Sequence, residues 1–425
     1  MFKVLVVAYY FPPMGLSGVQ RTLKFVKYMS RFNWEPTVIT TDQTAYFAHD
    51  YAMLKELEAT GVRVIRTGAK DPYSLVNKNG RIKMPAEWFR KMMSKISKTF
   101  FIPDNKIAWS NKAVKVIKDL LKEEKFDAIY VTIPPFSPFE KLAKLKSNFN
   151  IPLFVDYRDL WSGNHFAFYP TPYHKVKHKK LEYNALKNSD HIIVVNRKIK
   201  ENLLQKFPFL SFEDITIIPH GFDPEDFENK KNTLPVNDKL KIVYSGIFYE
   251  SVTPKYMLKA FRELLTERPE IASNIQFHFA GMFRRENAVL VKKLGLSEYV
   301  FDHGYMEHDE VIGKLIGADL LWVMLGKNKN IDTVTPGKLL EYFGTKKPIL
   351  ATVPKGIAEI VAKEYKASFV CEPDNIEEIK NTLVDIYNKF HQGKLPKPSD
   401  EYVDGYNRIY LTEQLTKQFQ FLLKD

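Results

Sequence analysis

Short apolar runs alternate with helix-length segments along this chain of 425 residues. Runs such as LFVD and IIVV are apolar on both faces, which is typical of parallel strands that are covered by helices on each side. Between them lie amphipathic segments such as 18–32, where apolar residues recur on one helical face. In the first half of the chain the apolar runs are 4–9, 37–40, 62–65, 128–132, 153–156, 192–195 and 215–218. This alternation predicts a doubly wound α/β domain.

The same alternation begins again after a charged stretch, PEDFENKKNTLPVNDK, that has the composition of a linker. A chain of this length also exceeds what one hydrophobic core usually organises. The later apolar runs are 242–244, 277–280, 320–323, 349–351 and 369–371. We therefore expect two similar α/β domains, and we place the parts of the chain at 1–218 (N-terminal domain), 219–238 (turn and linker), 239–404 (C-terminal domain) and 405–425 (a last helix).

Composition narrows the classes of protein without choosing one. Lysine and arginine outnumber aspartate and glutamate by 63 to 50, a net charge of +13 that suits anionic partners such as phosphorylated substrates, anionic lipid or nucleic acid. The one cysteine, Cys371, excludes a disulfide framework within the chain. No stretch reaches the length of a membrane-spanning helix. We expect a cytoplasmic protein.

The stretch TPGKLLEYFGTKKPIL, residues 335–350, combines features that favour opposite ligands. Pro336 is preset for a first helical turn, Gly337 lets the backbone approach a ligand closely, and Lys338 adds positive charge. The free amides of such a turn favour anions, whereas the carboxylate of Glu341 repels them. A nucleoside diphosphate satisfies both, with its phosphates on the turn and its ribose hydroxyls on the acid. In the alternative, Glu341 pairs with Lys338 or Lys346 on a solvated helix face.

A second glycine-containing stretch, YYFPPMGLSGVQR at 9–21, follows the first apolar run and opens the first helix. It contains Gly15 and Gly18 but neither the Gly-x-Gly-x-x-Gly fingerprint nor the Walker pattern, which argues against NAD or ATP. Either this loop approaches a ligand with its amides, or it is an ordinary strand-to-helix turn.

The stretch 335–350 resembles the nucleotide-sugar signature of retaining GT-B glycosyltransferases of family four, which includes many bacterial polysaccharide-building enzymes. Other pieces resemble the family in the same order: FDAIYVTIPPFS, IPLFVDYRDLW, SDHIIVVNRKIKENL, DITIIPHGFDPEDF, LKIVYSGIF, IQFHFAGM and GYMEHDEVIGKLIGADLLWVML. Residues 45–105 resemble it least. The resemblance implies two Rossmann-like domains facing each other across a cleft, with the C-terminal helix packing back on the N-terminal domain.

The resemblance also implies roles for individual residues. It implies that Glu341 holds the ribose hydroxyls and that the C-terminal domain binds the donor. Donor-binding residues would be Gly246, Thr333, Pro336, Gly337, Lys338, Leu339 and Glu341. The backbone of Tyr305 and Met306 would face the base, Gly15 and Gly18 would form a loop over the cleft, and the catalytic candidates would be Arg158, Asp159 and Lys255.

Three positions depart from the family pattern. Thr333 stands where relatives often carry the first of two glutamates, which leaves the contact to the sugar open. The usual Arg–Lys pair after the first strand of the donor domain is reduced to Lys255, and Arg284 or Arg285 could supply the missing charge. Arg158-Asp159 stands where many relatives have His-Asp, so this pair has either a catalytic role or a structural one.

Two further patterns concern metal and membrane. His174 and His178 are four residues apart, a spacing that can ligate a metal on one helix face, but no acidic partner follows, so we expect no metal site. Residues 80–101 carry an apolar stripe among basic residues. This segment could lie on an anionic membrane, or it could be a core helix with a solvated basic face.

The residue patterns suit a nucleotide sugar, and the resemblance implies a metal-independent, retaining glycosyltransferase that uses a UDP- or GDP-linked sugar as substrate and needs no cofactor. The acceptor would be a lipid-linked or polysaccharide-precursor glycan, met at the inner face of the membrane, and nucleic acid would not be a partner. The rivals are a sugar-nucleotide epimerase or phosphorylase on the same fold, and a basic, non-catalytic module that binds membranes or nucleic acid.

Overall fold

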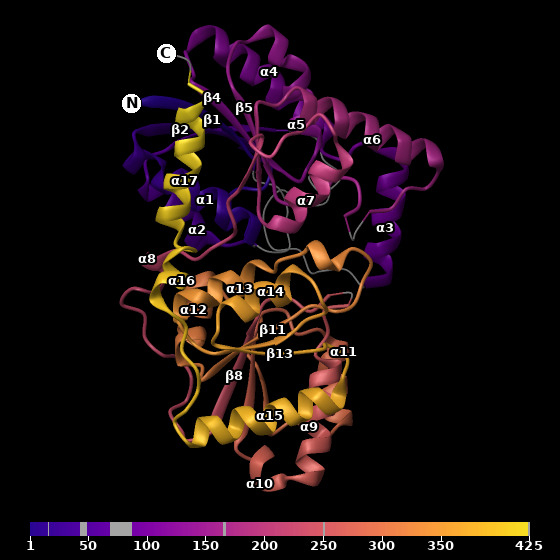
Figure 1. Cartoon of the computed structure of the whole chain (residues 1–425), viewed down its shortest axis with the longest axis vertical. Helices are drawn as coiled ribbons and strands as arrows, with labels where there is room; N and C mark the ends of the chain where they lie inside the picture. The colour runs from indigo at the N-terminus through magenta and orange to yellow at the C-terminus, as the bar shows by residue number, and fades with distance from the viewer. Residues whose placement is uncertain (16, 43–48, 69–86, 165–166, 250, 424–425) are drawn as a thin grey trace. The chain divides into compact units, whose positions relative to one another are not determined.

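The computed structural model describes residues 1–15, 17–42, 49–68, 87–164, 167–249 and 251–423 (Figure 1). The chain forms two compact units. The first contains residues 1–219 and 409–425, and the second contains residues 220–408.

The strands of the first unit are β1 (Phe2–Val7), β2 (Trp34–Thr41), β3 (Arg63–Thr67), β4 (Ala128–Ile133), β5 (Leu153–Tyr157), β6 (His191–Val194) and β7 (Ile215–Ile217). Within the described residues they form one seven-stranded sheet in the order β3-β2-β1-β4-β5-β6-β7. Every neighbouring pair is parallel, with registers such as Phe2 opposite Trp34 and Val4 opposite Ala128. Every residue of β4 and β5 is buried, as expected of strands that are covered on both faces.

The helices of the first unit are α1 (Ser17–Met29), α2 (Tyr51–Ala59), α3 (Glu87–Phe100), α4 (Ile107–Glu123), α5 (Ser137–Leu145), α6 (Pro172–Lys187), α7 (Arg197–Lys206) and α17 (Arg408–Phe421), with 3-10 turns η1 (Ser30–Phe32) and η2 (Lys146–Asn148). Helix α17, drawn in yellow in Figure 1, inserts Leu415 and Phe419 into the core of this unit. The Phe419 ring lies 4.7 Å from that of Phe154 and 5.2 Å from that of Trp34, measured between centroids. The end of the chain thus helps to close the first core.

The strands of the second unit are β8 (Leu240–Ser245), β9 (Ile275–Ala280), β10 (Val300–Asp302), β11 (Leu320–Met324), β12 (Ile349–Thr352) and β13 (Ser368–Cys371). In the part of this unit that the structure describes, they form a six-stranded parallel sheet in the order β10-β9-β8-β11-β12-β13. Its helices are α8 (Pro224–Phe227), α9 (Lys255–Glu267), α10 (Pro269–Ala272), α11 (Arg285–Lys293), α12 (His308–Gly317), α13 (Gly337–Tyr342), α14 (Ile357–Glu364), α15 (Ile376–His391) and α16 (Asp400–Asp404), with 3-10 turns η3 (Ile331–Thr333) and η4 (Phe343–Thr345).

The predicted fold class is confirmed, because both sheets have the doubly wound order in which the first strand lies beside the second and the fourth. Each predicted apolar run overlaps a strand, whereas β10 was missed. The segment 219–238 lies almost wholly within the second unit, where Phe222 and Leu234 join the core. The helix expected over 405–424 begins at Arg408.

A buried ion pair fixes the end of the first unit. Arg21 on α1 is fully buried and donates from Nε and Nη2 to the carboxylate of Asp156, with Nη2–Oδ1 at 2.8 Å. The same guanidinium donates to the carbonyl oxygens of Ile218 and Pro219, where the first unit ends. A planar group with five donors can serve the carboxylate and both carbonyls together. The Arg21 side chain therefore links α1 to β5 and to the backbone of Ile218 and Pro219.

No helix among the described residues is both long enough and apolar enough to cross a membrane.

Candidate functional site

The carboxyl end of β8 is the place where ligands bind in a sheet of this order, because the strand order reverses between β8 and β11. Gly246 follows β8 with φ +116°, a backbone conformation that other residues rarely adopt. Its N–H donates to the carbonyl oxygen of Ala280 at 2.8 Å. A Cβ on the neighbouring Gly281 would lie 2.1 Å from the Gly246 oxygen. Two glycines thus let backbone segments approach closely at this edge.

Helix α13 is held against this edge by its last residue. The phenol oxygen of Tyr342 accepts a hydrogen bond from the Ser245 N–H at 2.9 Å, and Tyr342 is buried. Pro336, expected in the first helical turn, instead precedes the helix with an extended backbone, and Gly337 is the first helical residue. Leu339 is fully buried, and its N–H donates to the Pro336 carbonyl oxygen at 3.0 Å, so the expectation that this amide is free to bind a diphosphate was wrong. The helix has only six residues, so its dipole is short.

Lys338 lies beside Gly246. Its ammonium donates to the Tyr244 hydroxyl at 2.7 Å and lies 3.9 Å from the centroid of the same ring. A Cβ on Gly246 would be only 2.7 Å from the Lys338 Nζ, so glycine makes room for the charge. Burial lowers the pKa of Lys338 to about 7, although Glu341 acts in the opposite direction. This ammonium is therefore poorly solvated and close to its titration point at neutral pH.

Glu341 pairs with a histidine that the sequence did not single out. His308 Nε2 lies 2.7 Å from Glu341 Oε1, and His308 Nδ1 lies 3.9 Å from Asp226 Oδ2. Lys346, the surface partner considered for Glu341, instead binds Asp400 at 2.6 Å. Glu341 is thus a mostly buried carboxylate with 16% of its side chain exposed.

The remaining candidates of the second unit lie in a 3-10 turn, a loop and the start of a helix. Thr333 is buried at the end of η3, and its hydroxyl donates to the Asn330 carbonyl at 3.0 Å. Tyr305 and Met306 lie in the loop between β10 and α12 and are partly exposed. Lys255 begins α9 and is exposed, with its ammonium 5.3 Å from the Tyr256 ring centroid.

The two arginines considered as replacements for the missing cation lie at the start of α11. Arg284 is the residue before the helix and pairs with Glu286 at 3.3 Å. Arg285 is the first helical residue. Glu286 therefore neutralises part of the charge that Arg284 could offer to a ligand.

Of the candidates of the first unit, Arg158 and Gly18 lie together. Its Nε and Nη2 donate to the carbonyl oxygens of Ile133 and Pro134, at 3.1 and 3.0 Å. A Cβ on Gly18 would lie 2.2 Å from Arg158 Nη1, so Gly18 permits this close approach. Gly15 is buried in the loop before α1, and Asp159 is partly exposed. The Arg158 side chain therefore holds the backbone at the carboxyl end of β4.

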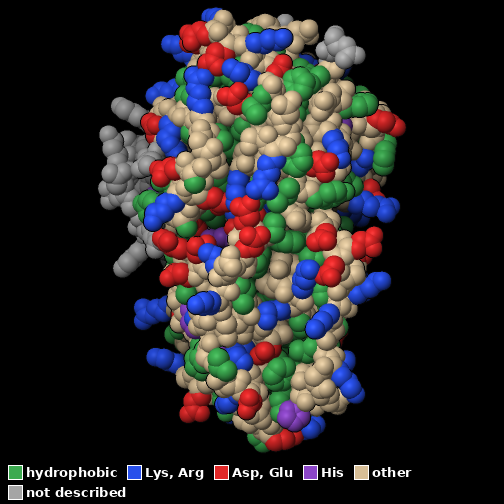
Figure 2. Space-filling view, turned by 90° about the vertical axis from the view of Figure 1, so that its left-hand side faces the viewer, with side chains coloured by type: hydrophobic (Ala, Val, Ile, Leu, Met, Phe, Trp, Pro, Cys, Tyr) green, Lys and Arg blue, Asp and Glu red, His purple; other side chains and the backbone are tan. Residues whose placement is uncertain are grey.

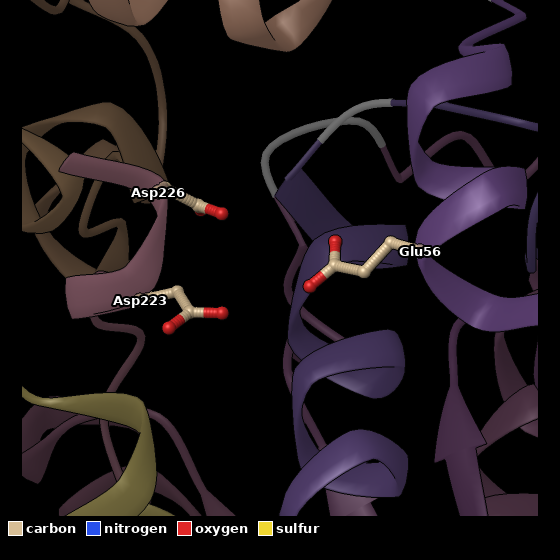
Figure 3. Close-up of side chains that lie close together, drawn as sticks. All are labelled: Glu56, Asp223 and Asp226. Carbon is tan, nitrogen blue, oxygen red and sulfur yellow. The ribbon is translucent and has the colours of Figure 1, made fainter. Parts of the chain in front are cut away.

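Two acidic side chains, Asp223 and Glu56, form hydrogen bonds within their own units. Figure 3 labels Asp223 and Asp226, both from α8 and the residue before it; Asp223 accepts a bond from the Glu225 N–H at 3.1 Å. Glu56 of α2, also labelled there, accepts from Lys24 and Lys27, each at 2.7 Å.

The histidine pair of α6 is engaged by neighbouring protein groups. His178 Nδ1 accepts from Trp161 Nε1 at 3.0 Å, and His174 lies within hydrogen-bond distance of Thr171 and Thr99. Burial lowers the pKa of His178 to about 4, so this ring is neutral at physiological pH.

Sequence comparison identifies the family in two consecutive parts. Residues 16–226 match the model described as Glycosyltransferase Family 4, and residues 225–393 match the model described as Glycosyl transferases group 1. No curated protein sequence matches the chain.

Solved structures share the fold at low sequence identity. Sucrose-phosphate synthase from Thermosynechococcus elongatus has a TM-score of 0.66 and 13% identity, over 99% of each chain. Anabaena HepE, solved in complex with UDP, has a TM-score of 0.61 and 14% identity, over 99% of this chain and all of that one. UDP-GlcNAc 2-epimerase from Methanocaldococcus jannaschii has a TM-score of 0.57 and 14% identity, over 99% of this chain and all of that one.

The doubly wound sheets of the two units, together with the matches to both family models, identify this chain as a GT-B glycosyltransferase. The chain belongs to the group 1 glycosyltransferase family.

Proposed function

We propose that this enzyme transfers a sugar, with retention of anomeric configuration, from a UDP- or GDP-sugar to a lipid-linked or polysaccharide-precursor glycan, without a metal ion. The second unit holds the donor and the first unit holds most of the acceptor. The observation that carries the proposal is the Lys338 ammonium beside Gly246 at the carboxyl end of β8, with Glu341 near enough to act on the pKa of that lysine. An ammonium and a carboxylate, both poorly solvated, match the two ends of a nucleoside diphosphate.

Sugar transfer from a nucleotide sugar requires stabilisation of the departing nucleoside diphosphate. Preorganised donors and positive charge lower the barrier most where solvent is restricted. Lys338 supplies a desolvated ammonium, the amides of Gly337 and Lys338 supply donors, and Lys255 is the proposed second cation. Glu341 holds the ribose, so that the scissile bond is placed relative to these groups.

A nucleotide panel followed by product analysis tests the function. UDP-, GDP- and ADP-sugars are screened by thermal shift, and the best donor is incubated with lipid-linked glycan acceptors in the presence of EDTA. We expect stabilisation by one nucleotide and a product with the donor's anomeric configuration in its proton NMR spectrum. An inverted product would contradict retention, and loss of transfer in EDTA would contradict metal independence.

The epimerase among the solved structures of this fold makes a same-fold rival worth testing directly. The donor is incubated without acceptor, with acceptor, and with phosphate. Our proposal predicts donor consumption and nucleoside diphosphate release that depend on acceptor. Conversion to an isomeric nucleotide sugar without acceptor would favour an epimerase, and consumption that depends on phosphate would favour a phosphorylase.

A lipid-linked acceptor is supported by the surface that α3 and α6 form in the first unit. These helices lie beside each other in Figure 1, and His174 Nε2 is 3.1 Å from the Thr99 carbonyl oxygen. Large apolar side chains are exposed on both, including Phe100 at 77%, Tyr173 at 65% and Val176 at 64%. The exposed lysines among them are Lys95, Lys175, Lys177, Lys179 and Lys180. Apolar and basic side chains together fit an anionic bilayer. Of the stretch 80–101, residues 80–86 lie outside the described residues.

We predict that Lys177→Glu/Lys180→Glu weakens binding to vesicles containing phosphatidylglycerol by at least about tenfold, since each basic residue near an anionic surface contributes about 1 kcal/mol. Vesicle co-sedimentation measures the effect. Lys292→Glu/Lys293→Glu changes two exposed lysines of α11 by the same total charge and should bind as wild type. Equal binding of wild type to anionic and neutral vesicles would contradict the membrane surface.

The rival of a basic, nucleic-acid-binding module predicts a gathered positive face. On the face drawn in Figure 2, lysine and arginine side chains are interspersed with aspartate and glutamate. A surface of mixed charge keeps a protein soluble, whereas binding of nucleic acid needs a continuous positive surface that displaces counterions from the phosphates. Salt-sensitive DNA binding, combined with no affinity for any nucleotide sugar, would favour this rival.

A further inference from the structure

The imidazole of His308 lies between two carboxylates of the second unit. Its Nε2 is 2.7 Å from Glu341 Oε1, and its Nδ1 is 3.9 Å from Asp226 Oδ2. The three side chains are 12%, 16% and 16% exposed, for His308, Glu341 and Asp226 respectively. Ion pairs on open surface contribute little, because water and mobile side chains compete with them. This group is shielded from most of that competition.

Three separate elements bring these residues together. His308 is the first residue of α12, and a capping box in which Glu307 and Glu310 serve each other's backbone fixes the start of that helix. Asp226 lies in α8, and Glu341 lies in α13, which Tyr342 anchors to β8. The ring position is therefore determined by backbone that is itself well fixed.

The contact constrains a side chain that otherwise rotates about three bonds. A hydrogen bond from Nε2 holds Oε1 of Glu341 and so orients the whole carboxylate. A carboxylate has about four acceptor positions, so this bond is compatible with two more from vicinal hydroxyls. Because a carboxylate only accepts, the proton of this bond is assigned to Nε2, and the 3.9 Å from Nδ1 to Asp226 Oδ2 is too long for a hydrogen bond. Holding the acceptor in its bound geometry lowers the entropic cost of gripping a ligand.

We propose that His308 is a positioning residue that presets Glu341 for the ribose hydroxyls of the donor nucleotide. The inference rests on the proposed function, since it requires that Glu341 binds the ribose. His308 acts through Glu341 and does not touch the reacting atoms. The affinity for ribose hydroxyls, and not for the diphosphate, should therefore depend on it.

A matched pair of variants isolates this role. The amide nitrogen of Gln reaches the position of Nε2, whereas that of Asn is one methylene shorter and cannot reach Glu341. Calorimetry is performed with UDP or GDP, whichever wild type binds, and with its 2′,3′-dideoxy analogue. We expect His308→Asn to weaken binding of the nucleoside diphosphate by on the order of tenfold and to leave the dideoxy analogue within about twofold of wild type. His308→Gln should keep both affinities within about threefold.

Two controls make the test decisive. His391→Ala alters an exposed histidine of the same unit and should change neither affinity. In a Glu341→Gln background, His308→Asn should cause little further loss, because the two residues act as one unit. If His308→Asn does not fold, His308→Phe, which keeps a ring in the site, takes its place.

The outcomes separate this inference from the proposed function. Full affinity of His308→Asn for the nucleoside diphosphate would overturn the inference, as would equal losses for both ligands or loss of discrimination in His308→Gln. Failure of wild type to bind any nucleoside diphosphate would instead overturn the proposed function.

Discussion

Glu341→Gln is expected to weaken binding of the donor nucleotide by about 100-fold, because hydrogen bonds to a charged acceptor contribute about 1.5–3 kcal/mol each. The amide keeps the volume of the side chain but has one acceptor oxygen and no charge. We expect kcat/KM for sugar transfer to fall by a similar factor. Isothermal titration with UDP or GDP and initial rates measured over a range of donor concentrations give both numbers.

A matched control separates a site effect from a helix effect. Glu359→Gln makes the same change on α14, where Glu359 pairs with Lys363 along the helix at 2.6 Å. Such pairs contribute less than about 1 kcal/mol, so affinity for the nucleotide should be unchanged. Wild-type affinity in Glu341→Gln, or the same loss in both variants, would refute the role assigned to Glu341.

Donor affinity is expected to fall as the pH rises above 7, because Lys338 has a pKa of about 7 and binds a diphosphate best when protonated. A bound diphosphate stabilises the ammonium and raises its pKa in the complex. Binding is therefore strongest below pH 7 and weakens through the window between the pKa values of the free and the bound protein. Between pH 6.5 and 8.5 we expect a loss of about 20-fold, measured by titration calorimetry.

Two substitutions at Lys338 check that this residue causes the pH dependence. Arginine stays charged throughout the range, so Lys338→Arg should flatten the profile even if its larger head lowers the overall affinity. Lys338→Met removes the charge and should give weak binding at every pH. A wild-type profile in Lys338→Met would assign the titration to another group.

The fold could be predicted because buried parallel strands need apolar residues on both faces. That requirement leaves a recognisable run in each of the twelve strands that the pattern located, including the fully buried β4, β8 and β11. β10 was missed because it is a three-residue strand at the edge of its sheet, with Phe301 and Asp302 exposed. An edge strand with exposed side chains carries little of the apolar signal that identifies a strand.

The start of the last helix shows a second limit of local pattern. The predicted helix started at residue 405, but the chain is extended at Asn407, where it pairs with Phe222. The Arg408 N–H also donates to the Phe222 carbonyl at 2.9 Å. Contacts between segments far apart in the sequence therefore decide where α17 begins.

Part of the candidate site could be located from local sequence alone. Local sequence marked Gly246 as the end of a strand, Lys338 as part of a Pro-Gly-Lys turn and Glu341 as an acid close to that turn. The structure places Lys338 beside Gly246, which agrees with this prediction. The partners Tyr244 and His308 could not be found in this way, because they lie 94 and 33 residues from the groups they contact. The residue roles themselves stay predictions until a ligand is bound.

A crystal structure of the protein with the nucleoside diphosphate selected by the panel tests the central claim most directly. The account predicts the pyrophosphate within hydrogen-bond distance of the Lys338 ammonium, close to Gly246, and both ribose hydroxyls on the carboxylate of Glu341. A nucleotide bound elsewhere, or bound at β8 with its ribose turned away from Glu341, would contradict it.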